Sequence, residues 1–343
     1  FIQMVSTLSF SVLYSTLVLY MKDQLAMPMS TANSIMGVFI AFNYGLHLLG
    51  GFLGGRFLSY RALFSVGMAA LVVGCVLLSF GSVEFLYYGL AAFLTGAGLN
   101  VTCLNCMLTQ LFTTEDPRRE TAFLWNYASM NVGFFVGFSV SGVFQLSHNY
   151  GTLFLFGSVG NLMALVICMV FWKQLADRNT SFSTSSKAAQ KKSTWLGLGM
   201  VALMPFALSQ LLQSAEWATR LVLVTGAIMM ATILYLARQQ DSEQARNKMY
   251  AFAVFMVVAT IFWMLFQIGP MGLTHFIDHN VTRHYDGWTI PPQWFQSVNT
   301  VSVVIGGPLL GYMLNRMRQN GVKVNIPAQF ALALLFIGLA FAI

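Results

Sequence analysis

The sequence predicts an all-α polytopic membrane protein, and three observations support that class. Of the 343 residues, 57% are hydrophobic and only 8% are charged, whereas an ordinary globular domain has about 25% charged residues. The mean hydropathy is +0.68. The few charged residues divide the chain into apolar runs long enough to cross a bilayer, which takes roughly 20 residues. These features exclude a secreted disulfide scaffold, a disordered chain and most soluble enzymes.

Eleven candidate spans follow one another along the chain. The run 121–172 counts twice because a polar stretch, 145–151, breaks it in the middle. The chain begins at Phe1 inside one apolar run and ends at Ile343 inside another, so we expect a part of a longer protein that lacks further helices at the C-terminal end. The runs are 1–21, 24–55, 62–83, 85–114, 121–172, 193–215, 221–237, 249–277, 287–315 and 324–343.

The basic residues predict the orientation, because cytoplasmic loops carry an excess of Lys and Arg. If the loop from Arg56 to Arg61 is cytoplasmic, only Lys22, Arg220 and Arg283 fall on the outer side, and the other 15 of the 18 basic residues lie inside. The N-terminus is then cytoplasmic, in a multi-pass plasma membrane protein, and a bacterial inner membrane fits this pattern. The net charge of +7 reports this topology rather than a nucleic-acid-binding face.

The chain divides into two groups of helices. We expect a six-helix bundle over 1–175, a Ser/Thr/Lys-rich cytoplasmic linker over 176–193, two inserted helices over 194–240, and helices 7–9 of a second bundle over 245–343. A short repeat supports two related halves, because Gly50-Gly51-Phe-Leu-Gly54 and Gly306-Gly307-Pro-Leu-Leu-Gly311 each close a span before a basic loop. Repeated six-helix halves are typical of major facilitator transporters.

Several segments then resemble one family, the proton-dependent oligopeptide transporters of the major facilitator superfamily. They are Asp116-Pro-Arg-Arg-Glu120 with Tyr127 and Asn131, Phe262-Trp263-Met-Leu-Phe-Gln267, and Ile290-Pro291 with Trp294 to Asn299. The resemblance implies two six-helix bundles with two extra helices between them, and proton-coupled uptake of di- or tripeptides by alternating access. It also implies a cytoplasmic loop motif, which comprises Gly51, Arg56, Arg61, Asp116, Arg118 and Arg119.

The chain departs from the family's pattern wherever the family has an ionisable group in the spans. The first-helix Glu-x-x-Glu-Arg is matched by Gln3-Met-Val-Ser6-Thr7, the fourth-helix Lys by Val101, and the seventh-helix Glu by Gln267; the loop Asp is Gly55. A lone charge in mid-membrane costs roughly 2.5–3.5 kcal/mol on insertion scales, so partial loss would strand the remaining charges. Coordinated loss indicates a working site rebuilt from neutral polar groups.

The polar residues left in the spans are the candidates for binding the solute, because polar groups in a membrane need partners or water. Gln3, Ser6, Thr7 and Tyr14 fall on one helical stripe. The predicted substrate-binding residues are Gln3, Thr7, Tyr44, Asn100, Asn131, Trp263, Gln267 and Asn299. Of these, Tyr44, Asn131, Trp263 and Asn299 are implied by the resemblance, and the others follow from polarity and position.

His47 is the candidate proton-coupling residue, because its unperturbed pKa lies near neutrality. The alternative is a neutral histidine that is hydrogen-bonded inside the bundle. Gly269-Pro270 predicts a kink and a candidate gating hinge in the seventh helix. His275, His279 and His284 lie near Asp278, where a metal site is conceivable but solvated loop residues fit better. We therefore expect neither a metal nor a cofactor.

Three functional readings remain open. The first is proton-coupled transport of di- or tripeptides or peptide-like solutes. The second is transport of another small polar solute, such as a siderophore or a metabolite, with different ion coupling; the third is a membrane sensor that does not transport. An enzyme is excluded because no nucleophile–base pair, P-loop or metal-ligand motif is visible. The expected partners are the solute, protons and the lipid bilayer, and not a nucleic acid.

Overall fold

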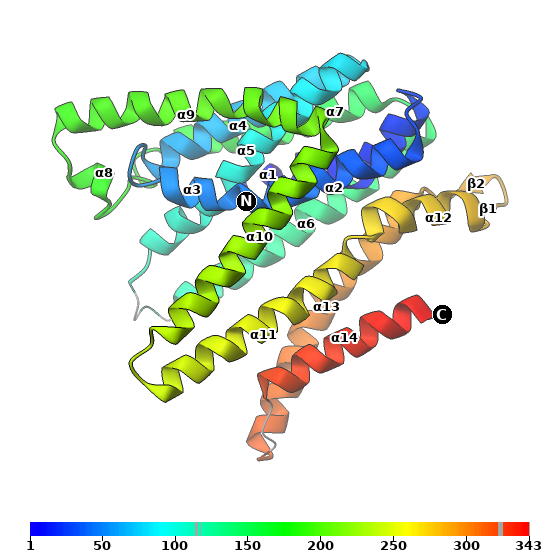
Figure 1. Ribbon diagram of the computed structural model, residues 1–343. Helices are drawn as coiled ribbons and strands as arrows, with labels where there is room; N and C mark the ends of the chain where they lie inside the picture. Colours follow the sequence, from blue (N-terminus) through cyan, green and yellow to red (C-terminus); the bar gives the residue numbers. More distant parts are fainter. Residues whose placement is uncertain (114–115, 117, 322–324, 343) are drawn as a thin grey trace.

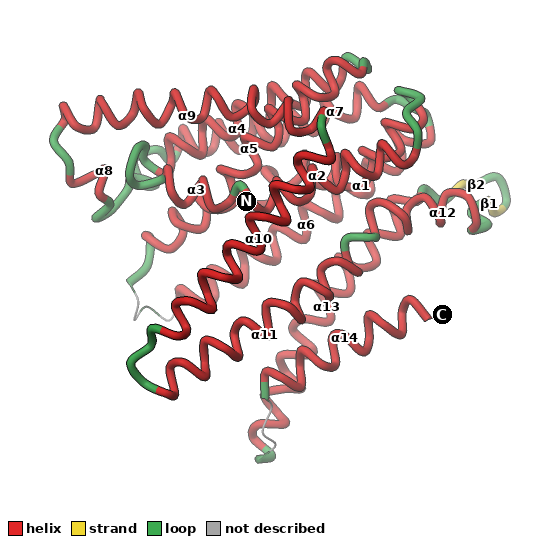
Figure 2. Tube along the Cα trace, viewed as in Figure 1, coloured by secondary structure: helices red, strands yellow, loops and turns green. Residues whose placement is uncertain are grey.

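Long helices make up most of the computed structural model, which describes residues 1–113, 116, 118–321 and 325–342 (Figures 1 and 2). Ten helical segments in the described residues are long and apolar enough to cross a membrane, and the shorter apolar helix Ile326–Ala342 is an eleventh segment. Each of the eleven predicted spans therefore corresponds to one such helix. A two-stranded hairpin of β1 (His284–Tyr285) and β2 (Trp288–Thr289) is the strand structure of this part of the chain.

The first half of the chain forms a bundle in which close helix contacts depend on glycine. A Cβ on Gly74 of α4 would lie 2.7 Å from the backbone nitrogen of Phe93 in α5, and one on Gly137 of α6 would overlap Ser11 of α1. The helices are α1 (Ile2–Asp23), α2 (Met29–Gly45), α3 (His47–Leu53), α4 (Tyr60–Ser79), α5 (Val83–Gln110), α6 (Arg118–Leu146) and α7 (Tyr150–Val170).

Helix α1 lies against α6 and α7, and most of its residues are buried. Its polar side chains are satisfied inside the bundle: Ser9 Oγ donates to Asn161 Oδ1 of α7 at 2.9 Å, and Tyr20 Oη donates to the carbonyl of Leu78 in α4 at 3.1 Å. Hydrogen bonds between helices stabilise membrane bundles in this way. α1 is therefore the fixed centre of the first half.

The segment 176–193, the predicted cytoplasmic linker, is partly helical. It contains the short helix α8 (Ser181–Thr184) and the start of α9 (Lys187–Gln213), where the Ser186 side chain caps the helix by accepting from Ala189 N. The segment also packs on the inner ends of the bundle, since Asp177 accepts from the backbone N–H of Tyr60 at 2.9 Å and Phe182 N donates to Gly55 O at 2.8 Å. A helix cap and two hydrogen bonds to the bundle therefore hold this segment.

The second half begins after α10 (Ala215–Arg238), which lies beside α2 and α11 (Figure 1). The predicted kink occurs as a π-helical turn, η1 (Gly269–Leu273), in which Thr274 Oγ1 donates to Gly269 O at 2.8 Å. This turn joins α11 (Glu243–Phe266) to α12 (Thr274–Asn280); α13 (Pro292–Gln319) packs on α6, and α14 (Ile326–Ala342) packs on α11.

We call the ends of the helices near Asp23, Gly81, His148, Ser214 and Asn280 the outer end, following the predicted orientation. The opposite ends, near Gly54, Leu111, Phe171 and Gln239, are the inner end. These names describe the two sides of the bundle in all that follows.

Candidate functional site

The two halves of the chain meet around Gln267, which follows the last residue of α11 and precedes the π turn. Tyr14 Oη of α1 donates a hydrogen bond to Gln267 Oε1 at 2.7 Å. Gln267 Nε2 donates a longer one, of 3.5 Å, to Tyr44 Oη of α2. One neutral amide thus bridges two helices of the first half to a helix of the second, so that Gln267 is the polar contact nearest the middle of the bundle.

Aromatic rings extend this contact. The Tyr44 ring lies 6.4 Å from the Trp263 ring across the two halves and 6.0 Å from the His47 ring. Tyr44 is 47% exposed and Trp263 is 50% exposed, so about half of each side chain is accessible. Such rings offer a large apolar face together with a polar atom for a hydrogen bond. We call Tyr14, Tyr44, His47, Trp263 and Gln267 the central cluster.

Gln3, Thr7 and Asn131 are predicted binding residues that lie within the first half instead. Gln3 Nε2 donates to Thr7 Oγ1 at 3.2 Å within α1, and Asn131 Nδ2 donates to Tyr127 O at 3.0 Å within α6. All three are at most 7% exposed. Gly133, next to Asn131 in α6, has no room for a side chain against Met4 of α1. The structure therefore places these residues beside the α1–α6 contact and does not join them to Gln267.

The remaining predicted residues are separated from one another. Asn100 of α5 is 6% exposed, and its Oδ1 has no hydrogen-bond partner among the described residues. Asn299 of α13 is exposed and makes no side-chain hydrogen bond within that same part of the chain. His47 begins α3 directly after the break at Leu46; its carbonyl accepts from Thr102 Oγ1 at 2.9 Å. Its Nε2 is buried and has no partner in the described structure.

The loop-motif residues lie at the inner end, away from the central cluster. The Arg61 guanidinium lies 4.6 Å from the Trp172 ring and donates to the Trp172 carbonyl, whereas Arg56 stacks on Phe52 at 5.3 Å. Arg118 pairs with Asp116 at 2.8 Å, and this hydrogen bond lowers the pKa of the Asp116 carboxyl. Gly51 is at ordinary packing distance from Thr102, and Arg119 N donates to the carbonyl of Asp116.

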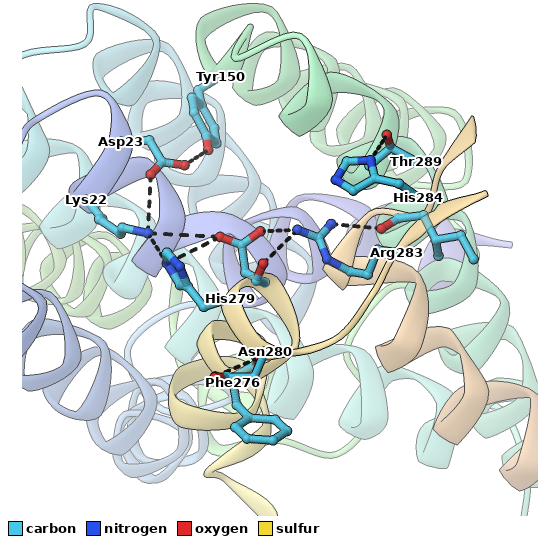
Figure 3. Close-up of polar contacts among 11 residues, drawn as sticks. Lys22, Asp23, Tyr150, Phe276, His279, Asn280, Arg283, His284 and Thr289 are labelled. Carbon is cyan, nitrogen blue, oxygen red and sulfur yellow. Dashed lines mark hydrogen bonds and ion pairs between the residues drawn. The ribbon is translucent and has the colours of Figure 1, made fainter. Parts of the chain in front are cut away.

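A charged network joins the two halves at the outer end (Figure 3). Lys22, at the end of α1, has its Nζ 2.6 Å from His279 Nε2 and 3.9 Å from Asp278 Oδ2, both in α12. Within the second half, Arg283 Nη2 donates to Asp278 Oδ1 at 2.7 Å. We call this network the outer clasp; its residues are Lys22, Asp23, Tyr150, Asp278, His279 and Arg283.

The outer clasp is anchored within each half by a hydrogen bond between one charged and one neutral group. Tyr150 Oη of α7 donates to Asp23 Oδ2 at 3.0 Å, and Arg283 Nη1 donates to the carbonyl of Ile290 at 2.9 Å. Among the first-half residues of the clasp, Lys22 is therefore the one that makes polar contacts with the second half in the described structure.

Further outward contacts accompany the outer clasp. Trp294 Nε1 of α13 donates to the Ser139 carbonyl of α6 at 3.1 Å, and the Trp294 ring fills the space left by Gly142. Sequence reasoning counted Lys22 and Asp278 as loop charges and missed that they meet. Their positions at the ends of two apolar runs, both on the predicted outer side, were the available signal.

Comparisons with known proteins agree on one family. The model of the PTR2 (POT) family matches residues 57–343. Dipeptide and tripeptide permease A of Proteus mirabilis is 27% identical over 335 residues, covering 96% of this chain and 67% of the permease. Permease B of Photorhabdus asymbiotica is 24% identical, covering 95% and 66%. The chain thus spans about two thirds of the length of these curated relatives.

Solved structures show the same fold. A peptide transporter POT in complex with sulfate superposes with a TM-score of 0.84 at 23% identity, over 99% of this chain and 72% of that one. A POT family transporter in complex with 5-aminolevulinic acid gives a TM-score of 0.84 at 20% identity, over 99% and 73%. The predicted fold class, an all-α polytopic protein of the major facilitator type, is confirmed.

Proposed function

Because this chain belongs to the POT family, a family of permeases rather than enzymes, we propose that it is a secondary active transporter. Its solutes are di- or tripeptides or peptide-like molecules, carried by alternating access between the two halves. The relatives named above are dipeptide and tripeptide permeases, which supports this class of solute. Their bacterial origin and the bias of basic residues support an inner membrane location with a cytoplasmic N-terminus.

The observation that carries the proposal is the distribution of contacts between the halves. Among the described residues, each side-chain hydrogen bond, ion pair or ring contact between residues 1–170 and 243–342 lies at Tyr44 or further toward the outer end. The outer clasp and Trp294 close one side, and the central cluster is the innermost contact. This pattern supports a transporter captured with its outer side closed, in which the central cluster meets the solute from the inside.

Residues of the central cluster are proposed to contact the solute. The half-exposed rings of Tyr44 and Trp263 supply stacking surface, and Gln267 ties the solute position to both halves. Binding that favours one arrangement of the halves shifts the population toward it. Gly269 and Pro270 are proposed as the hinge, because the π turn interrupts the helix between Gln267 and the outer clasp.

Proton coupling through His47 is part of the proposal. Its unpaired Nε2 is able to take a proton or to hold a hydrogen-bonded solute. Replacing it by His47→Gln keeps a hydrogen-bonding side chain but removes the titration. We expect the pH dependence of uptake to flatten in this variant, and an unchanged profile would contradict a coupling role.

Uptake by the full-length protein in proteoliposomes tests the function. The assay presents labelled dipeptides, tripeptides, peptide amides and cyclic dipeptides, with and without an inward-directed proton gradient, and uses protein-free liposomes as the control. We expect at least one of these solutes to accumulate above the control. If none accumulates under either condition, the proposed function is wrong.

A further inference from the structure

The central cluster is far from every charged side chain on its own helices. Tyr14 is eight residues from Lys22, and Gln267 is eleven residues from Asp278. At 1.5 Å per residue these separations are roughly 12 and 16 Å. Trp263 is fifteen residues from Lys248 and fifteen from Asp278, or roughly 22 Å.

The middle turns of the helices in both halves also lack charged side chains. No Asp, Glu, Lys or Arg occurs between positions 23 and 56, 84 and 115, 120 and 173, 248 and 278, or 286 and 316. These stretches therefore offer no Asp, Glu, Lys or Arg to pair with a carboxylate or an ammonium group bound beside Gln267, and His47 is the one residue of the central cluster that can carry a positive charge. Desolvating an ion without a countercharge is strongly unfavourable.

The hydrogen-bonding groups of the site suit neutral amides. Tyr44 Oη accepts from Gln267 Nε2, so its own proton is free to donate to a solute carbonyl. The Gln267 side chain offers an amide C=O and N–H, the same pair of groups that a peptide bond presents. Trp263 and Tyr44 add apolar faces on which a planar amide ring can stack.

On the basis of the proposed transport function, we propose that the preferred solute is an uncharged peptide-like amide, of the class of cyclic dipeptides, and not a zwitterionic linear peptide. The site recognises paired amide C=O and N–H groups through neutral side chains and packs the solute against the exposed faces of Tyr44 and Trp263. Terminal charges count against binding here, because the middle turns of these helices carry no Asp, Glu, Lys or Arg to pair with them.

Equilibrium binding and uptake with two labelled probes test the proposal. The probes are cyclo(Ala-Ala) and linear Ala-Ala, which share both residues and differ in their terminal charges, and binding is measured on purified full-length protein. We expect binding of the cyclic probe at least tenfold tighter, which corresponds to about 1.4 kcal/mol. Equal or tighter binding of linear Ala-Ala would overturn the proposal and leave the transport function standing. If neither probe bound or was transported, the proposed function would fail for both classes.

A matched pair of variants separates charge from shape. Gln267→Lys places an ammonium group at the contact with Tyr14, whereas Gln267→Met removes the same hydrogen bonds without adding a charge. We expect Gln267→Lys to bind linear Ala-Ala at least tenfold more tightly than Gln267→Met does, while both bind the cyclic probe more weakly than the unaltered protein. Equal affinity of the two variants for linear Ala-Ala would contradict the argument, provided that both remain monodisperse.

Discussion

Replacing Lys22 by Met should open the outer side. Lys22 carries the ionic contacts of the outer clasp across the halves, whereas Asp278 keeps its 2.7 Å pair with Arg283 in the variant. At 3.9 Å the gross attraction between Lys22 and Asp278 is about 4 kcal/mol at an effective dielectric constant near 20. Both side chains are less than a third exposed, and desolvation offsets much of this attraction. We expect a net loss of about 1.4 kcal/mol, or a tenfold shift toward the outward-open arrangement.

Electron–electron double resonance, which measures the distance between two spin labels, reports this shift directly. Labels at Glu84 in α5 and Asp286 in the β1–β2 turn lie on the outer side of opposite halves, and both positions are exposed. The Lys22→Met variant should populate longer distances than the parent. Arg220→Met is the matched control, because Arg220 pairs with Glu216 one turn away in the same helix and ties no halves together. If Lys22→Met and Arg220→Met gave the same distance distribution as the parent, the outer clasp would not hold the halves closed.

Two further predictions concern stability. A Gly137→Leu side chain would overlap Ser11 in α1, and we expect the free energy of unfolding, measured by thermal unfolding, to fall by about 1–3 kcal/mol. Gly226→Leu is the control, because nothing lies within 4 Å of that position, and its free energy of unfolding should fall much less. Burial raises the pKa of Asp177, although its hydrogen bond from Tyr60 N partly opposes this. The stability that this raised pKa contributes is present below the carboxyl's ordinary pKa and is lost as the pH rises through the folded-state value. The Tm of the parent minus the Tm of Asp177→Asn should therefore fall from acidic toward neutral pH, and a rise of this value over the same range would contradict the assignment.

The sequence was sufficient for the helices and for part of the site. Apolar runs between sparse charges predicted each membrane helix, because crossing a bilayer demands length and hydrophobicity whatever the tertiary packing. Polarity and position identified Gln267, and the family resemblance implied Tyr44 and Trp263, which the structure brings together with it. The π turn occurs at the predicted Gly269-Pro270 kink.

Tertiary packing decided the rest. Gln3 and Asn131 are polar and lie in spans, yet each is satisfied within its own helix, a choice that composition does not reveal. The Lys22–Asp278 contact joins residues 256 positions apart in the chain, and no local pattern pairs them. The sequence also did not reveal that the linker before α9 packs on the inner ends of the bundle, because Asp177 and Phe182 bond to Tyr60 and Gly55, which are distant in the chain.

Locking the outer clasp tests alternating access most directly. Lys22→Cys with His279→Cys, in a background without the four native cysteines, places one thiol on each side of the contact in which Nζ and Nε2 are now 2.6 Å apart. A short bismaleimide would then bridge the halves, and counterflow of a labelled transported solute is followed in proteoliposomes. A Glu216→Cys and Arg220→Cys pair within α10 is the control. We predict that bridging abolishes counterflow in the first protein and spares it in the control, whereas undiminished counterflow through the bridged protein would contradict transport by alternating access.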